Sequence, residues 1–157
     1  MHQKPLGLRR PPLNCCNCPL RDLASIVPVS PAQATAIDHA RAGVRCYRPH
    51  APIYFEGDAG GELLTLFSGW AFSYQMLADG RRQILRFVLP GDVAGVQPDL
   101  TGPLDHGLET ITDVAVCVFA RDALRALLGR EPELGWQFTW LLAHDQVLLH
   151  QHLTNVG

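Results

Sequence analysis

The chain has 157 residues, of which 47% are hydrophobic and 18% are charged, a composition typical of one globular domain that buries its own core. The formal net charge of −2 excludes the global positive field of a protein that coats nucleic acid. The first ten residues, MHQKPLGLRR, lack the apolar core of a signal peptide, and no run reaches the ~18 apolar residues of a membrane helix. These features predict a cytoplasmic protein with no membrane partner.

Residues 1–29 are predicted to be a mobile N-terminal arm. Three of the five cysteines of the chain fall within four positions there, in the sequence LNCCNCPL. Such a group suggests a metal or iron–sulfur site, a disulfide staple, or reactive thiols without a partner. In a reducing compartment, clustered cysteines are more often metal-binding or redox-active than disulfide-bonded. The staple is therefore the weakest of these three interpretations.

A short helix is predicted over residues 31–42. Ser30 is suited to the N-cap, Pro31 to the first helical position, and Gly43 to the stop. The helix would stand at the start of the second unit of the chain, residues 30–129.

The rest of that unit has the pattern of short antiparallel strands. From residue 44 to residue 119, short apolar or alternating runs are separated by glycines. Asp79-Gly80, between two alternating runs, predicts a hairpin. The region is therefore predicted to be mainly β, a barrel or sandwich flanked by short helices.

Residues 130–157 are predicted to form a long terminal helix with apolar side chains on two opposed sides. At about 100° per residue, one side carries Leu134, Phe138, Leu141, Leu148 and Leu149, and the other carries Trp136, Trp140, Ala143 and Val147. A helix that lies on one domain needs a single apolar stripe, so the second stripe predicts a homodimer. A helix buried in a larger core is the alternative, but too little chain remains to cover both sides. The expected dimer interface consists of Leu134, Phe138, Leu141, Asp145 and Leu148.

Four glycine motifs follow one another in the β region. They are FEGD at 55–58, ELLTLFSG ending at Gly69, the Asp79-Gly80 turn, and LPGDVAG at 89–95. In this order and spacing they resemble the sensory half of Crp/Fnr-type transcription regulators. The resemblance covers the chain from about Pro52 to its end. It implies a double-stranded, jelly-roll-like β-roll, then a long dimerisation helix, then a winged helix-turn-helix that reads DNA. No such module follows within these residues, so DNA binding is expected only of a longer parent chain.

The resemblance also bears on the ligand of the roll. Family members that bind cyclic nucleotides hold the ribose with a glutamate and the phosphate with an arginine. Here the glutamate position is Val96, and no Lys or Arg lies between Arg86 and Arg121. The loop carries acidic residues instead, namely Asp99, Asp105 and Glu109. Because a buried phosphodiester needs a fixed cation or several donors, the chain is predicted not to bind cyclic AMP or cyclic GMP.

The oxygen-sensing branch of the family implies a different input, an iron–sulfur cluster held by N-terminal cysteines and one cysteine of the roll. Cys15 and Cys18 form a C-x-x-C pair that matches two of the N-terminal ligands. Cys117, in VAVCVFARDAL, matches the ligand from the roll. The third N-terminal position is Ala24 here. The ligands implied are therefore Cys15, Cys18 and Cys117, with Cys16 as the further cofactor-binding residue.

Several alternatives stay open. Cys46 could replace Cys16 as the fourth ligand. A single zinc ion or a thiol switch could also replace the cluster, in an effector-binding or purely structural dimerisation module. Cys117 could also be only a small buried hydrophobic residue. His144 and His150 would suggest a haem-based gas sensor, but they lie on opposite flanks of the terminal helix. An enzyme is not expected, because the chain has no P-loop, dinucleotide fingerprint, nucleophile elbow or H-E-x-x-H motif.

Overall fold

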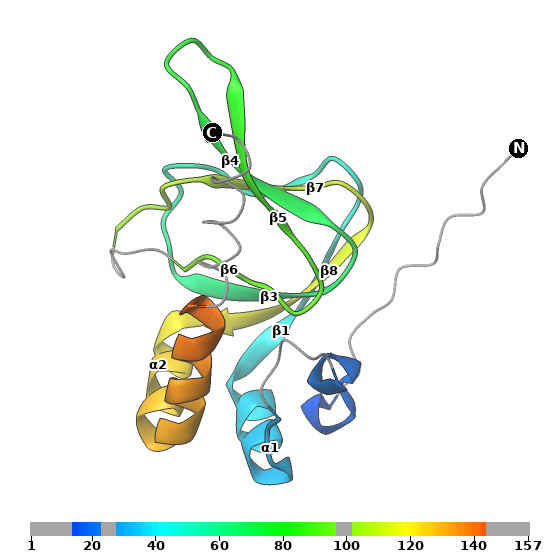
Figure 1. Ribbon diagram of the computed structural model, residues 1–157, viewed down its shortest axis with the longest axis vertical. Coiled ribbons are helices and arrows are strands. Elements are labelled where there is room, and N and C mark those ends of the chain that lie inside the picture. Colours follow the sequence, from blue (N-terminus) through cyan, green and yellow to red (C-terminus); the bar gives the residue numbers. More distant parts are fainter. Residues whose placement is uncertain (1–13, 23–27, 97–101, 144–157) are drawn as a thin grey trace, which may run out of the picture.

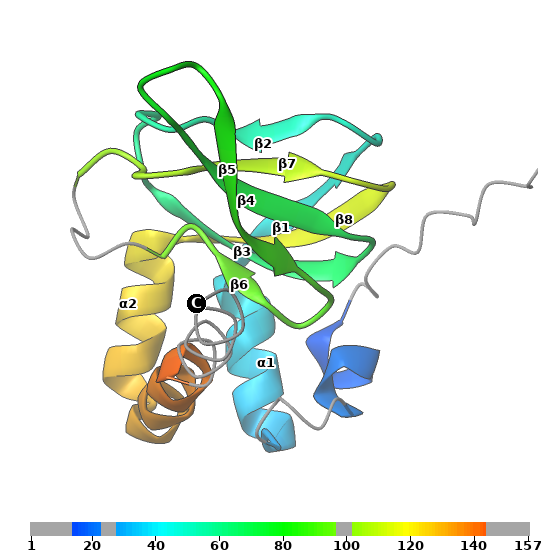
Figure 2. The same cartoon turned by 45° about the horizontal axis from the view of Figure 1, so that its top comes forward.

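The fold is a β-roll with helices on one side of it. The computed structural model describes residues 14–22, 28–96 and 102–143 (Figure 1). Two four-stranded antiparallel sheets pack against each other, with strand orders β1-β8-β3-β6 and β2-β7-β4-β5. The helices lie beneath the first sheet, and the β4–β5 hairpin projects away from them (Figure 2). The predicted fold, mainly β with flanking helices, is confirmed.

The elements follow one another along the chain with short connections. The strands are β1 (Arg41–Tyr47), β2 (Pro52–Tyr54), β3 (Glu62–Ser68), β4 (Ala71–Met76), β5 (Arg82–Val88), β6 (Val93–Ala94), β7 (Gly107–Thr110) and β8 (Val114–Ala120). The helices are η1 (Cys15–Asn17) and η2 (Pro19–Asp22), both 3-10, α1 (Pro31–Ala40), α2 (Arg121–Arg130) and a last helix over residues 132–143.

The core lies between the two sheets and continues beneath the first one. Side chains alternate between the two faces of a strand, and on β8 Val114, Val116 and Val118 point into the core of the roll. Cys117 and Phe119 point to the opposite face of β8, and they are also buried because they face the layer of helices. Burial on both faces explains why this strand is an unbroken apolar run.

Glycines set two of the tight turns of the roll. Gly69 has a φ of +88°, and a Cβ atom there would lie 2.1 Å from the carbonyl oxygen of Asp113. Gly95 has a φ of +83°, with the carbonyl oxygen of Glu62 2.6 Å from the same built position. Only a residue without a side chain fits such a conformation at such close approach. The glycine motifs therefore mark where the strands reverse.

The start of α1 follows the prediction, whereas its end does not. The hydroxyl of Ser30 accepts a hydrogen bond from the backbone N–H of Gln33, and the Gln33 side chain accepts one from Ser30, which forms a capping box. The helix ends at Ala40, and Arg41 already belongs to β1. Gly43 is thus a strand residue, in a β-bulge against β8.

The described part of the predicted N-terminal arm has regular local structure. This part, residues 14–22, forms the two 3-10 helices, and η1 packs against α1. The backbone N–H of Cys15 donates a hydrogen bond to the carboxylate of Asp38 on α1, at 3.3 Å. This portion of the arm is therefore docked on the domain. Residues 1–13 and 23–27 lie outside the described residues.

The two apolar stripes of the last helix differ in their exposure. Leu134 is 6% exposed, whereas Trp136 and Trp140 on the other stripe are 72% and 45% exposed. The structure therefore assigns Leu134 to the core of its own chain, which differs from its predicted place in a dimer interface. Two members of that predicted interface, Phe138 and Leu141, are half-buried. The other two, Asp145 and Leu148, lie outside the described residues.

Candidate functional site

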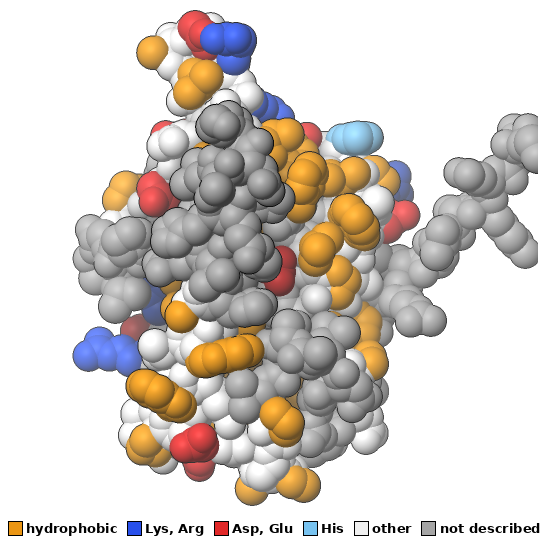
Figure 3. Space-filling view, viewed as in Figure 1, with side chains coloured by type: hydrophobic (Ala, Val, Ile, Leu, Met, Phe, Trp, Pro, Cys, Tyr) orange, Lys and Arg blue, Asp and Glu red, His pale blue; other side chains and the backbone are white. Residues whose placement is uncertain are grey.

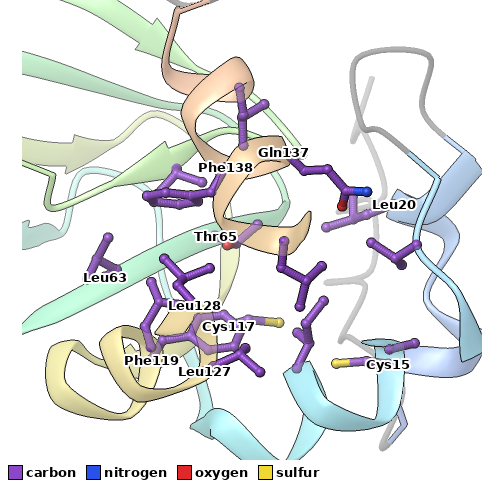
Figure 4. A pocket seen from close by; sticks show the side chains of 18 of the residues that line it. Cys15, Leu20, Leu63, Thr65, Cys117, Phe119, Leu127, Leu128, Gln137 and Phe138 are labelled. Atoms are coloured by element: carbon purple, nitrogen blue, oxygen red, sulfur yellow. The ribbon is translucent and has the colours of Figure 1, made fainter. Parts of the chain in front are cut away.

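An apolar pocket lies between the helices and the first sheet, and three cysteines line it. Its volume is about 220 Å³. Cys15 and Cys18 reach it from the arm, and Cys117 reaches it from β8. Figure 4 shows the sulfur atoms of Cys15 and Cys117 directed into the same space. The described part of the chain thus brings together the three cysteines that the sequence implied as ligands.

The fold explains how residues so distant in sequence meet. Cys117 points out of the roll because its neighbours Val116 and Val118 occupy the inner face of β8. Cys15 is the first residue of η1 and Cys18 follows the last one. The N–H of Cys18 donates to the carbonyl of Cys15 at 3.2 Å. A turn of this kind lets both side chains of a C-x-x-C pair face one side. The docking of η1 on α1 then carries the pair to β8.

The two remaining cysteines differ in placement. Cys46 is exposed near the end of β1 and does not line the pocket. Cys46 was a candidate for the fourth ligand on sequence grounds, but its position outside the pocket does not support that role. The backbone of Cys16 belongs to η1, but its side chain lies outside the described residues. The fourth-ligand prediction for Cys16 therefore stays a prediction.

The surroundings of the thiols favour their protonated forms. Burial, helped by a hydrogen bond to Asp38, raises the pKa of the Cys15 thiol to about 12. Burial also raises the pKa of Cys117, although a hydrogen bond from Arg41 and the charge of that guanidinium oppose the increase. Both groups are thiols at neutral pH in the metal-free chain.

The sulfur atoms of the pocket are suitable donors for an iron–sulfur cluster. Cysteine sulfur is the usual ligand of such clusters, and three cysteines line one apolar space. Within the described ranges, however, no group of three or more His, Cys, Asp or Glu side chains is arranged to hold a metal ion. The ligands share a pocket without forming a preassembled cage, so binding would have to draw the sulfurs together.

The roll itself offers little room for a nucleotide. The second cavity measures about 110 Å³ and lies beside β1, β3 and the loop before β3, whereas small-molecule sites usually measure about 300–1,000 Å³. On the second sheet, Tyr74 is 2% exposed, and its ring packs beside Gly107, where a Cβ atom would lie 2.5 Å from it. The second cavity among the described residues is therefore smaller than a usual small-molecule site.

The arginines of the strands are already paired. Arg45 pairs with Glu62 on β3, and Arg82 pairs with Glu109 at 2.6 Å while its guanidinium lies over the ring of Tyr74. Arg86 donates to the carbonyl oxygen of Val93 at 2.7 Å. Local sequence does not indicate that Arg82 meets Glu109, because the two residues lie on different strands of the sheet. These pairs leave the strand arginines committed to groups within the chain.

A half-buried polar network joins Tyr54, His106 and Asp105. The hydroxyl of Tyr54 lies 3.0 Å from Nε2 of His106, and Nδ1 of the same ring lies 2.6 Å from the carboxylate of Asp105. Burial raises the pKa of Tyr54 to about 12. The histidines proposed for haem, His144 and His150, lie outside the described residues.

Comparison with known proteins decides the family. Residues 44–131 match the family model described as the cyclic nucleotide-binding domain. This chain is a member of that family. It has the form found in Crp/Fnr-type regulators, as its glycine motifs predicted.

Two curated relatives show the same kinship. The transcriptional activatory protein AadR of Rhodopseudomonas palustris is 30% identical over 139 residues, which are 85% of this chain and 57% of AadR. The nitrogen fixation regulation protein FixK of Bradyrhizobium diazoefficiens is 26% identical over 91% of this chain and 59% of its own length. The chain thus spans somewhat more than half the length of these members.

A solved member of the family has the same fold. The structure of FixK2 from Bradyrhizobium japonicum superposes with a TM-score of 0.62 at 30% identity, covering 70% of this chain and 55% of FixK2.

Among the described residues, no helix is long and apolar enough to cross a membrane.

Proposed function

We propose that this chain is the sensory and dimerisation part of a Crp/Fnr-type transcription regulator whose input is oxygen or redox state. The observation that carries the proposal is the shared pocket of Cys15, Cys18 and Cys117. Thiols at a surface gain no packing from lying close together, whereas thiols that line one apolar pocket can act together as metal ligands. DNA binding would belong to another part of a longer protein.

A cyclic nucleotide is not the proposed input, despite the name of the family. The second cavity is small, and the strand arginines are paired with carboxylates or carbonyls of the chain. A phosphodiester entering the roll would have to displace one of these partners. Its negative charge would otherwise stay unpaired at a cost of several kcal/mol.

Cys15, Cys18 and Cys117 would hold the iron–sulfur cluster, with Cys16 as the fourth ligand. When bound, the cluster supplies reversible redox chemistry at iron. The chain contributes the positions of the sulfurs, and its apolar walls, such as Phe119 on β8, keep water from them. Loss of the cluster would remove the iron–sulfur link between the arm and β8.

A simple thiol switch is less well supported than a metal-bound sensor. Reactive cysteines usually have a lowered pKa, because the thiolate is the nucleophile. Here burial raises the pKa of both Cys15 and Cys117. Iron would offset that effect by binding the deprotonated sulfur directly.

The pocket also offers a route for the signal. Gln137, Phe138 and Leu141 of the last helix line it together with the cysteines, and Figure 4 shows Phe138 and Gln137 above Cys117. A change in the position of the arm would therefore alter the packing of the helix. We infer that this helix forms the homodimer, with the exposed Trp136 in the interface.

Exposed apolar side chains support self-association. Besides Trp136, the strand β5 exposes Ile84, Leu85 and Phe87, and Figure 3 shows hydrophobic side chains gathered along the middle of the face that β5 crosses. Soluble monomers rarely expose contiguous apolar patches larger than a few hundred Å². A second copy of the chain is the proposed partner.

Anaerobic purification tests the proposal directly. We expect the protein to carry iron and acid-labile sulfide, and to have a coloured absorption that bleaches in air. Cys117→Ser should lose most of the iron, whereas Cys46→Ser, which alters an exposed thiol outside the pocket, should retain it. A colourless wild-type protein without iron or sulfide would refute the iron–sulfur input.

A further inference from the structure

A polar cluster stands at the edge of the sulfur pocket, where α1 passes into β1. One carboxylate oxygen of Asp38 accepts a hydrogen bond from the guanidinium of Arg41 at 2.8 Å and one from the backbone N–H of Cys15 at 3.3 Å. The thiol of Cys15 donates to the same carboxylate, and Arg41 donates to the sulfur of Cys117. The ion pair thus connects the arm to β8.

Both members of the ion pair occupy unfavourable positions. Asp38 lies in the last turn of α1, where the helix dipole disfavours a negative charge. The side chain of Arg41 is only 11% exposed, and a buried cation is costly unless it is paired. The contacts that the two residues make with each other and with the cysteines stabilise both positions.

We propose that Asp38 and Arg41 are positioning residues of the sulfur site: Asp38 holds the arm through Cys15, and Arg41 orients the sulfur of Cys117. This inference rests on the proposed function, because it concerns the same pocket. It adds that the arm docks without any metal, so that the cysteines already line one pocket before a cofactor draws their sulfurs together.

The arginine has a second consequence once the sulfurs bind iron. Arg41 stays charged at every physiological pH, and it stands beside a ligand sulfur. Hydrogen bonds to the sulfurs and nearby positive charge raise the reduction potential of iron–sulfur clusters, because they stabilise the more negative reduced state. Removing this guanidinium should therefore make a bound cluster harder to reduce.

The first test uses the reduced, metal-free protein. Hydrogen exchange of residues 14–22 is followed in the wild type, in Asp38→Ala and in Arg45→Gln. The last variant is a matched control, because Arg45 also lies on β1 and pairs with a carboxylate, but away from the pocket. Asp38→Ala should speed exchange in residues 14–22 about tenfold, since a charged hydrogen-bond acceptor is lost. The control should leave it unchanged.

A conservative variant separates positioning from folding. Asp38→Asn keeps an acceptor oxygen and should restore part of the protection, whereas exchange in β3 and β8 should be unaltered in every variant. If Asp38→Ala fails to fold, Asp38→Asn alone decides, with an intermediate exchange rate expected. The inference would be overturned if residues 14–22 exchange as slowly as in the wild type in both Asp38 variants. If only one variant folds, wild-type exchange in that variant would overturn it.

The second test uses the iron-loaded protein and separates the two proposals. Arg41→Gln should have a lower reduction potential than Arg45→Gln, and Arg41→Lys should lie between Arg41→Gln and the wild type. If the wild type binds no iron, the proposed function fails, and hydrogen exchange still decides the role of Asp38. If iron binds and the potential of Arg41→Gln equals that of the control, the role of Arg41 fails alone.

Discussion

The exposed stripe of the last helix gives the sharpest test of self-association. Trp136 is 72% exposed in the single chain. Taking about 200 Å² for the residue, roughly 140 Å² is available, which corresponds to about 3.5 kcal/mol on full burial at about 25 cal/mol per Å². Burial at an interface is incomplete and ordering opposes it. Trp136→Ala should therefore weaken the dimer by about 3 kcal/mol for its two copies, about a hundredfold in the dissociation constant.

Sedimentation at several protein concentrations measures this effect, and Leu134→Ala provides the contrast. Leu134 lies on the other stripe and is 6% exposed, so its truncation should lower the free energy of unfolding by about 2–5 kcal/mol. We expect Trp136→Ala to change the dissociation constant much more than the unfolding midpoint of the monomer. A dimer as tight as the wild type in folded Trp136→Ala, or a wild type that stays monomeric, would refute this interpretation of the helix.

Three further outcomes follow from the roll. Calorimetry should detect no binding of cyclic AMP or cyclic GMP, because the strand arginines are paired within the chain; micromolar affinity for either nucleotide would contradict this. The raised pKa of Tyr54, from 10.0 to about 12, means that only the unfolded chain ionises this group as the pH passes 10. The difference in unfolding free energy between the wild type and Tyr54→Phe should thus be constant below pH 10, and the wild type should lose about 1 kcal/mol relative to the variant by pH 11. Denaturant titrations in which this difference stays constant up to pH 11 would contradict the expectation. Gly95→Ala should lower the free energy of unfolding by about 2 kcal/mol or more, because φ is +83° and the carbonyl of Glu62 stands 2.6 Å from the new Cβ; an unchanged melting temperature would show the reasoning to be wrong.

The β-roll was predictable because its turns depend on local chemistry. Positions such as Gly69 and Gly95 need a backbone conformation that glycine adopts readily, so the motifs are visible in the sequence. The convergence of Cys15, Cys18 and Cys117 was expected from the family resemblance alone. No local pattern could reveal it, since it depends on how η1 docks on α1.

Two features were not predictable, for physical reasons that can be named. The terminal helix has two apolar stripes of similar strength, and periodicity alone does not say which of them faces the parent chain. Leu134 was consequently placed in the wrong environment, whereas the exposed Trp136 lies on the other stripe. Asp38 and Arg41 escaped notice because their importance comes from contacts with distant residues. A carboxylate at the C-terminal end of a helix was the one available signal.

Hydrogen exchange of residues 132–143, compared between anaerobic iron-loaded protein and the same protein after exposure to air, tests the central claim most directly. The claim is that the sulfur pocket passes its state to the last helix. We predict that exchange in residues 132–143 changes when iron is lost, while exchange in the β4–β5 hairpin stays constant. Iron that binds and leaves without any change in that helix would contradict the account.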